Sequence, residues 1–192
     1  MLDIDKHIQG FIKLISSGDV EVYNEFSLQH ELGIYLREHV IGHKVQFERN
    51  VVYFNCTYEN FEKKEIDISI FNEGMQDKYA IELKFPRNGQ HPVQMYSSCV
   101  DICFLEQLVF HCGFTKCYFL MLVDDPLFYS NDNIDTSGIY AYFRNGKELS
   151  GSISKPIKNL KGKLKLQNSY YIKWYKLKDD DVRRYALVIV NL

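Results

Sequence analysis

The spacing of apolar residues changes from helical to alternating within the first half of the chain. Apolar residues three or four positions apart precede Gly18 and predict a short amphipathic helix that ends near residue 16. A second helix is expected to begin near Ser27, because a serine hydroxyl can accept a free backbone N–H of a first helical turn. The apolar stripes of the two helices are Ile8, Phe11, Ile12 and Ile15, then Leu28, Leu32, Tyr35 and Leu36.

Three strands, a long helix and a further strand are predicted to follow. Segments 45–54, 64–71 and 79–85 are rich in β-branched and aromatic residues, as is typical of strands. The apolar run 92–112 starts with a proline and is followed by a glycine, which indicates one mostly buried helix. The continuous apolar run 117–123 is typical of an inner strand covered on both faces. Strand, helix and strand in this order imply a parallel crossover.

The C-terminal part is expected to add strands to the same domain. Strand-like segments lie at 139–143, 170–177 and 184–190, and a lysine-rich, glycine-containing stretch separates the first two. The chain has 192 residues, is 46% hydrophobic and shows no internal repeat or linker. We therefore expect a single α/β domain over residues 1–192, with a core of about 25–123 and a lysine-rich β tail of about 139–192.

Alternation within the second and third predicted strands separates apolar from charged side chains. In segment 64–71 three isoleucines share one face, which places Asp67 on the other face. In segment 79–85 Glu82 and Lys84 share the face opposite the apolar residues. The isoleucines are Ile66, Ile68 and Ile70, and the apolar residues of the third strand are Tyr79, Ile81, Leu83 and Phe85.

The connection between these strands predicts their register. Gly74 and Met75 can form a two-residue turn, with the glycine at the position that requires positive φ. This turn pairs residue 73 with residue 76 and sets Asp67 directly opposite Glu82 on one face. Like charges directly opposite each other destabilise an antiparallel pair, so a cation is expected between the two carboxylates.

Two carboxylates at this separation are hard oxygen ligands of the kind that Mg²⁺, or Mn²⁺, accepts together with water and a substrate phosphate. Lys84 would point at the same water or phosphate, where its ammonium could orient the nucleophile or stabilise developing charge. Glu62-Lys63-Lys64 is a second match to acid-x-lysine, but it lacks the surrounding strand, helix and strand. The structural alternative is a solvent-facing hairpin with an ordinary cross-strand salt bridge.

The residues resemble those of the PD-(D/E)XK phosphodiesterase superfamily, which includes restriction endonucleases, Holliday junction resolvases and recombination exonucleases. The resemblance covers roughly residues 25–123 and is carried by Glu31 in LQHELGIYL, by Asp67 in EIDIS, and by Glu82 and Lys84 in IELKFP. A helix and a strand follow, as in the family. Ile66 stands where the motif's name has proline, which many members also lack.

The resemblance implies a restriction endonuclease-like fold, in which helices flank a mixed central sheet, with additional C-terminal strands here. It implies Mg²⁺ or Mn²⁺ bound by Asp67 and Glu82, and assistance to the attacking water from Lys84. Glu31 would be a further ligand or would support the ligands. The implied activity is metal-dependent cleavage of nucleic acid, with DNA favoured over RNA, in restriction, repair or defence.

Charge is segregated along the chain and suggests where nucleic acid would bind. Residues 149–178 carry a charge of +8, which leaves −10 on the rest of a chain whose net charge is −2. Lysines neutralise phosphates and release counterions, although a solvated lysine-rich hairpin would look the same. The candidate contacts are Arg87, Lys155, Lys158, Lys161, Lys163, Lys165 and Lys173. Two other functions stay open: a catalytically silent nuclease-fold module that binds nucleic acid or protein, and a defence or antitoxin-like interaction protein that does not contact nucleic acid. A homodimer or a protein partner is a further open expectation.

The cysteines and the N-terminus indicate where in the cell the protein is expected. Five cysteines in a chain of this size predict reduced thiols without disulfides, and Cys99, Cys103, His111, Cys112 and Cys117 offer a zinc site as an alternative. No apolar run is long enough to cross a membrane and the N-terminus does not resemble a signal peptide. A cytoplasmic protein without membrane contact is expected.

Overall fold

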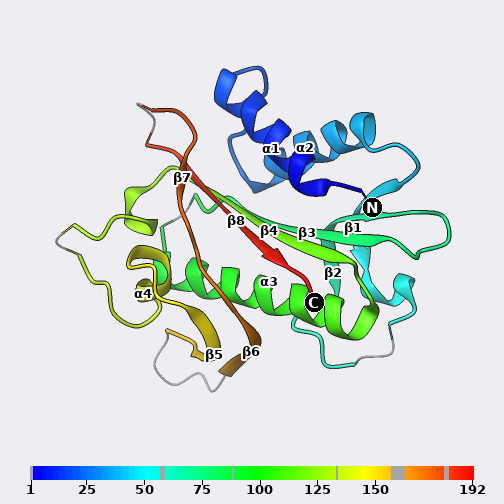
Figure 1. The fold of residues 1–192 in the computed structure, drawn as a ribbon. Helices are drawn as coiled ribbons and strands as arrows, with labels where there is room; N and C mark the ends of the chain where they lie inside the picture. The colour runs from blue at the N-terminus through cyan, green and yellow to red at the C-terminus, as the bar shows by residue number, and fades with distance from the viewer. Residues whose placement is uncertain (1, 57–58, 88, 133, 157–162, 180–181) are drawn as a thin grey trace.

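The computed structural model describes residues 2–56, 59–87, 89–132, 134–156, 163–179 and 182–192. It shows an α/β arrangement in which helices lie on both faces of a mixed six-stranded sheet (Figure 1). Helices α1 (Ile4–Ser17) and α2 (Glu25–His39) cover one face, and α3 (His91–Cys112) covers the other. The expected α/β class with a mixed, helix-flanked sheet is therefore confirmed.

The sheet has the strand order β1-β2-β3-β4-β8-β7. The strands of this sheet are β1 (Lys44–Asn50), β2 (Glu65–Phe71), β3 (Lys78–Lys84), β4 (Lys116–Val123), β7 (Tyr175–Lys176) and β8 (Arg184–Val190). β3 and β4 are parallel and α3 connects them, whereas the other neighbours are antiparallel. The predicted parallel crossover and the predicted strand at 184–190 are both confirmed.

A separate hairpin of β5 (Leu149–Ser154) and β6 (Lys163–Tyr170) packs on α3 from the side away from the sheet (Figure 1). Helix α3 is therefore covered on two sides, which explains why it is apolar around most of its circumference. The carboxylate of Glu106 on α3 fixes the hairpin, because it accepts the backbone N–H groups of Gln167 and Asn168 at 2.9 and 2.8 Å and the hydroxyl of Tyr170 at 2.9 Å.

Helix α2 begins earlier than the sequence suggested. Its N-cap is Asn24, whose side chain accepts the backbone N–H of Ser27 at 2.7 Å. The Ser27 hydroxyl accepts the backbone N–H of Asn24 at 3.0 Å in return. The expected start near Ser27 is two residues late, because serine is not the N-cap but the reciprocal partner within a capping box, three residues into the helix. The earlier start brings Glu25 into the first helical turn.

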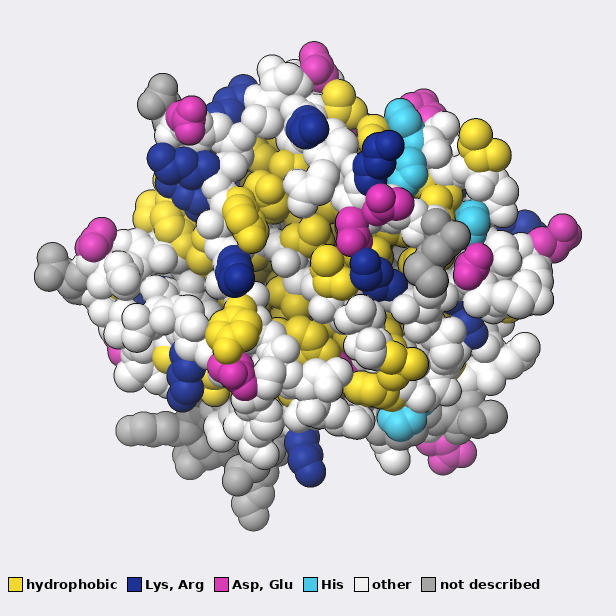
Figure 2. Space-filling view, in the orientation of Figure 1, with side chains coloured by type: hydrophobic (Ala, Val, Ile, Leu, Met, Phe, Trp, Pro, Cys, Tyr) yellow, Lys and Arg dark blue, Asp and Glu magenta, His cyan; other side chains and the backbone are white. Residues whose placement is uncertain are grey.

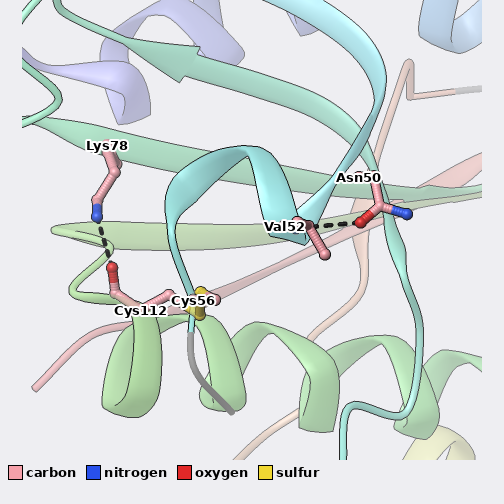
Figure 3. Close-up of a disulfide and its surroundings, with 5 residues drawn as sticks. All are labelled: Asn50, Val52, Cys56, Lys78 and Cys112. Atoms are coloured by element: carbon pink, nitrogen blue, oxygen red, sulfur yellow. Dashed lines mark hydrogen bonds between the residues drawn. A yellow bond between two sulfur atoms is a disulfide. The ribbon is translucent and has the colours of Figure 1, made fainter. Parts of the chain in front are cut away.

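The first predicted strand is shorter than 45–54. It ends at Asn50, and the 3-10 helix η1 (Val51–Phe54) follows, because the Asn50 side chain accepts the backbone N–H of Val52 at 3.0 Å and caps the turn (Figure 3). A disulfide then joins Cys56 to Cys112 at the end of α3, with 5.1 Å between their Cα atoms (Figure 3). The expectation of five reduced cysteines is wrong for this pair, whereas Cys99, Cys103 and Cys117 are free and buried.

The loop between β2 and β3 is longer than a two-residue turn. Asn72 and Asp77 close it, since the Asn72 backbone N–H donates to the Asp77 carbonyl at 3.2 Å. The residue with positive φ is Met75, at 55°, and not Gly74. The pairing of Ile68 with Ile81 nevertheless matches the predicted register. Lengthening the loop by one residue on each side leaves the register unchanged.

The C-terminal predictions are partly wrong. Segment 139–143 lies mostly in helix α4 (Tyr140–Arg144), because the guanidinium of Arg144 donates to the carbonyl groups of Leu127 and Asp135 and closes this turn of chain. Of the strand expected at 170–177, only Tyr170, the last residue of β6, and the two residues of β7 (Tyr175–Lys176) are in strands. Short apolar runs fit either a strand or a helical turn, and spacing alone does not separate them. A short 3-10 helix, η2 (Pro126–Phe128), follows β4.

Among the residues that the structure describes, no helix is both long and apolar enough to span a bilayer.

Candidate acid–lysine site

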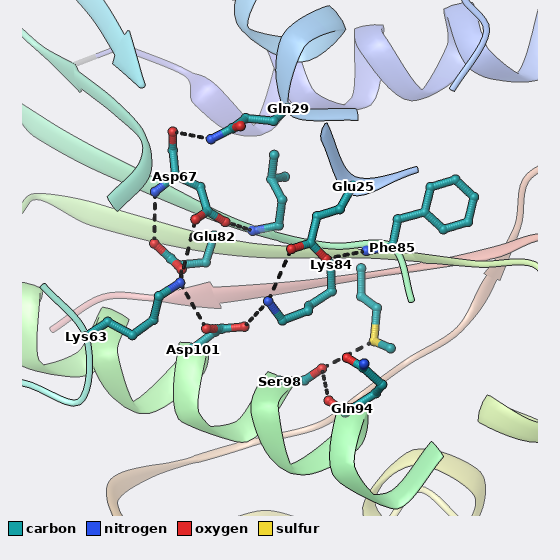
Figure 4. Close-up of polar contacts among 12 residues, drawn as sticks. Glu25, Gln29, Lys63, Asp67, Glu82, Lys84, Phe85, Gln94, Ser98 and Asp101 are labelled. Atoms are coloured by element: carbon teal, nitrogen blue, oxygen red, sulfur yellow. Dashed lines mark hydrogen bonds and ion pairs between the residues drawn. The ribbon is translucent and has the colours of Figure 1, made fainter. Parts of the chain in front are cut away.

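The site lies where the pairing of β2 and β3 ends. The last paired residues are Ile68 and Ile81, and beyond them side chains replace the backbone ladder. The Asp67 backbone N–H donates to Oε1 of Glu82 at 3.2 Å, and the Leu83 backbone N–H donates to Oδ2 of Asp67 at 2.8 Å (Figure 4). Each carboxylate is thus held by the backbone of the opposite strand, which fixes the two side chains relative to each other.

The ammonium group of Lys63 lies among three carboxylates. It donates to Oε2 of Glu82, and its Nζ lies 3.2 Å from Oδ1 of Asp101 and 3.6 Å from Oδ1 of Asp67 (Figure 4). Lys63 comes from the segment just before β2, whereas Asp101 comes from the middle of α3. The two predicted ligands therefore do converge on a single cation, which here is a lysine.

Lys84 lies beside this group and has its own partners. Its Nζ is 3.1 Å from Oδ2 of Asp101 and 3.5 Å from Oε1 of Glu25, the first residue of α2. The other oxygen of Glu25 accepts the backbone N–H of Phe85 at 2.9 Å. Asp101 thus contacts both lysines, one with each oxygen, and links them into one network (Figure 4).

Burial makes this network strongly coupled. Glu82 is fully buried, and burial together with the charges of Asp67 and Asp101 raises its pKa well above the usual value, against the opposing effect of Lys63. Burial also raises the pKa of Asp101, against the opposing charges of Lys84 and Lys63. For both lysines burial lowers the pKa, but the nearby carboxylates outweigh it and the pKa values are raised. Both lysines therefore stay protonated at neutral pH.

The network opens to solvent through shallow cavities. One of about 290 Å³ is lined by Asp67 and Leu83 of the strands and by Glu25, Phe26, Gln29 and Glu48. A second, of about 460 Å³, contains Lys84, Arg87 and Gln94, and it shares Glu25 and Phe26 with the first. A third, also of about 460 Å³, lies beside Asp67 and is lined by Glu48, Lys63, Lys64 and Glu65. The network is therefore open to solvent on the Asp67 side and on the Lys84 side.

Asp67, Glu82 and Lys84 are brought together, as the alternation of β3 indicated. Because Glu82 is fully buried, it does not belong to an ordinary solvent-facing hairpin. Ile68 and Ile70 pack under α1 and α2 as expected, but Ile66 packs on the α3 side. Strict alternation therefore fails in β2 beside Asp67, and on β1 the residue between the pairs Phe47–Ile68 and Arg49–Ile66, Glu48, has a φ of 47° and is itself unpaired in the ladder.

Among the described interactions, none joins Glu31 to these residues, and its expected support of the site stays a prediction. Its carboxylate lies 3.8 Å from Nδ1 of His30. Glu25 and Gln29 are the residues of α2 that reach the strands: the Gln29 amide donates to the backbone carbonyl of Asp67 at 2.9 Å. Glu25 and Gln29 are four residues apart on one helix face, whereas Glu31 is turned about 200° away from Gln29.

The predicted phosphate contacts have mixed outcomes. Arg87 forms an ion pair with Asp124, at the rim of the cavity that contains Lys84. Lys165 and Lys173 are exposed, and Lys155 is half-buried beside the hairpin. Lys158, Lys161 and the side chain of Lys163 lie outside the described residues. On the face shown in Figure 2, basic side chains are scattered among acidic and apolar ones and form no continuous patch.

Three residues of the network were not predicted from the sequence. Asp101 carried a signal, since an acid within the apolar stretch CVDICF must find a partner when buried. Lys63 belongs to the acid-x-lysine match that was set aside for lack of context. Glu25 gave no signal, because the helix start was placed after it.

The residues fit a divalent ion of the Mg²⁺ type. Asp67 and Glu82 supply oxygens that already reach one cation, and Mg²⁺ needs only one or two carboxylates besides water and phosphate. Among the described residues, no group of three or more His, Cys, Asp or Glu side chains is placed to hold a metal ion. For the zinc alternative, the disulfide removes Cys112 as a thiolate ligand.

Comparison with known proteins adds no relative: no protein-family model, curated protein or solved structure matches this chain.

Proposed function

We propose that the protein is a Mg²⁺-dependent phosphodiesterase that cleaves nucleic acid, with DNA as the first substrate to test. One observation carries the proposal: the carboxylates of Asp67 and Glu82, from adjacent strands, contact the same cation, and the ammonium of Lys84 lies beside them. The order of helix, three strands, helix and strand through α2, β1–β3, α3 and β4 supports it, because the PD-(D/E)XK resemblance implies this order. A restriction endonuclease-like fold is part of the proposal.

Asp67 and Glu82 would hold the metal ion, which lowers the pKa of a bound water and withdraws charge from a phosphate. The task of Lys84 is to orient that water or to stabilise the charge that develops on the phosphate. Asp101 and Glu25 hold its ammonium from two sides, so the charge is positioned before substrate arrives. Asp101 and Glu25 thereby serve as positioning residues.

The experiment is a cleavage assay on supercoiled, linear and single-stranded DNA and on RNA, with Mg²⁺, Mn²⁺, Ca²⁺ or EDTA. Cleavage with Mg²⁺ or Mn²⁺ and none with EDTA is the expected result. Cleavage that continues unchanged in EDTA would remove the metal from the mechanism. Absence of cleavage on all four substrates would refute the proposed phosphodiesterase activity.

A second function is favoured by the position of Lys63. Because its ammonium already contacts the buried Glu82, this carboxylate has a cationic partner without any metal. A catalytically silent module that binds nucleic acid or a protein partner would keep such a network for stability alone. Metal-independent binding of DNA without cleavage would support this function.

A further inference from the structure

Lys63 lies outside the acid-x-lysine motif, yet it makes the most central contacts of the site. We propose that Lys63 is a second active-site lysine, which occupies the cation position while metal is absent and leaves it when a divalent ion binds. This inference rests on the proposed metal-dependent function. It assigns a role to a residue that the motif does not contain.

The contacts of Glu82 require the exchange. Its side chain is fully buried, with Oε1 bonded to the Asp67 backbone N–H and Oε2 bonded to Lys63. A divalent ion that coordinates Glu82 and Asp67 would therefore approach the oxygens that the ammonium now contacts. Two cations at that distance repel strongly where little water screens them. Binding of the ion and retention of the ammonium are thus mutually unfavourable.

The structure offers a place for the displaced ammonium. Lys63 precedes β2, its side chain is 26% exposed, and it lines the cavity of about 460 Å³ that also contains Lys64 and borders Asp67. The ammonium can swing into this cavity and remain beside the metal ligands, where a substrate phosphate would lie. Lys84 need not move when the metal ion binds, because Asp101 and Glu25 hold its ammonium outside the pair of metal ligands.

The test is Mn²⁺ binding to the full chain without substrate, measured by electron paramagnetic resonance. Lys63→Met removes the competing charge and keeps the length of the side chain. It is expected to bind Mn²⁺ more tightly than the wild type, on the order of tenfold, which corresponds to about 1.4 kcal/mol. Lys64→Met is the matched control: it loses the same charge from a neighbouring, exposed position and should stay within roughly twofold of the wild type.

A second measurement uses the unaltered chain, in case Lys63→Met does not fold. The ¹⁵N signal of the Lys63 Nζ atom is expected to shift when Mg²⁺ saturates the protein, while that of Lys64 stays in place. Lys63→Arg identifies the signal by removing it.

The outcomes separate this inference from the proposed function. Suppose that the wild type binds Mn²⁺. If Lys63→Met then binds Mn²⁺ no more tightly, or if the Lys63 signal does not shift, the role of Lys63 is overturned and the proposed metal-dependent enzyme stands. Absence of Mn²⁺ binding to both the wild type and Lys63→Met would overturn both.

Discussion

The acid–lysine site and the β5–β6 hairpin are both rich in charge, but they place it differently. In the site, the ammonium groups of Lys63 and Lys84 are mostly shielded from solvent and contact buried carboxylates. In the hairpin, Lys165 is exposed, and the buried charge is Glu106 of α3, whose partners are backbone N–H groups and a hydroxyl. The two lysines that contact buried carboxylates in the site therefore lie outside the segment in which lysine is most abundant.

This difference predicts that charge changes in the site alter chemistry, whereas those in the hairpin alter stability or affinity. Desolvated charges interact strongly and are costly to unpair, whereas exposed charges are screened by water and salt.

The largest effect is expected at Lys84. Lys84→Ala should lower the cleavage rate by about 10²–10³, by analogy with removing one preorganised donor from a transition state. Binding of DNA should change little, because this lysine is one of several cations near the site. The measurement is single-turnover cleavage with Mg²⁺ beside a binding isotherm, and Lys13→Ala, at an exposed position on α1 away from the cavities, serves as the control. A rate within threefold of the wild type would exclude Lys84 from the chemistry.

Next in size is the effect of Glu106 on stability. Glu106→Gln puts amide hydrogens near backbone N–H groups that now donate to a carboxylate. The expected loss is about 1–3 kcal/mol in the free energy of unfolding, which lowers Tm by several degrees. Glu148→Gln is the control, because Glu148 accepts hydrogen bonds from Ser169 and Tyr171 on the same hairpin at the surface. Equal decreases in Tm for Glu106→Gln and Glu148→Gln in a thermal scan would contradict the expected difference between the buried and the exposed glutamate.

The hairpin lysines are expected to govern affinity. A variant with Lys161, Lys163 and Lys165 replaced by alanine should bind DNA more weakly, whatever the nucleotide sequence of the DNA. The slope of log K against log[salt] should become shallower by about one for each phosphate that the variant no longer neutralises. Titrations at several salt concentrations measure both quantities, with Lys84→Ala as the comparison. An unchanged slope would mean that other residues bind the phosphates.

The smallest effect is expected at Phe26, which is 72% exposed and borders both the Asp67 and the Lys84 cavities. Its ring can stack on an unpaired base, so Phe26→Ala should weaken single-stranded DNA binding about fivefold, with a smaller change for duplex DNA. Val52→Ala removes a comparably exposed apolar side chain away from these cavities and should have no effect. Equal losses on both DNA forms would argue against stacking.

The sequence predicted most where a local rule sufficed. Alternation along β3 placed Glu82 and Lys84 on one face, and the apolar run at 117–123 identified β4. It predicted less where two local structures compete for the same residues. Ser27 suits both a helix cap and the inner position of a capping box, and Ile139, Ala141 and Phe143 alternate as a strand would although Tyr140–Arg144 form a helix.

By itself, the sequence predicted that an Asp and a Glu-x-Lys lie on neighbouring strands, because alternation along β3 indicated the face of Glu82 and Lys84 and the short connection between the strands indicated their register. Only the tertiary structure decided what surrounds them. Glu25, Lys63 and Asp101 come from a helix start, a loop and a buried helix, and they meet Glu82 and Lys84 because α2 and α3 pack on opposite faces of the same strands. The burial of Glu82 and Asp101 follows from that packing, and burial is what makes their pairing with the two lysines so strong.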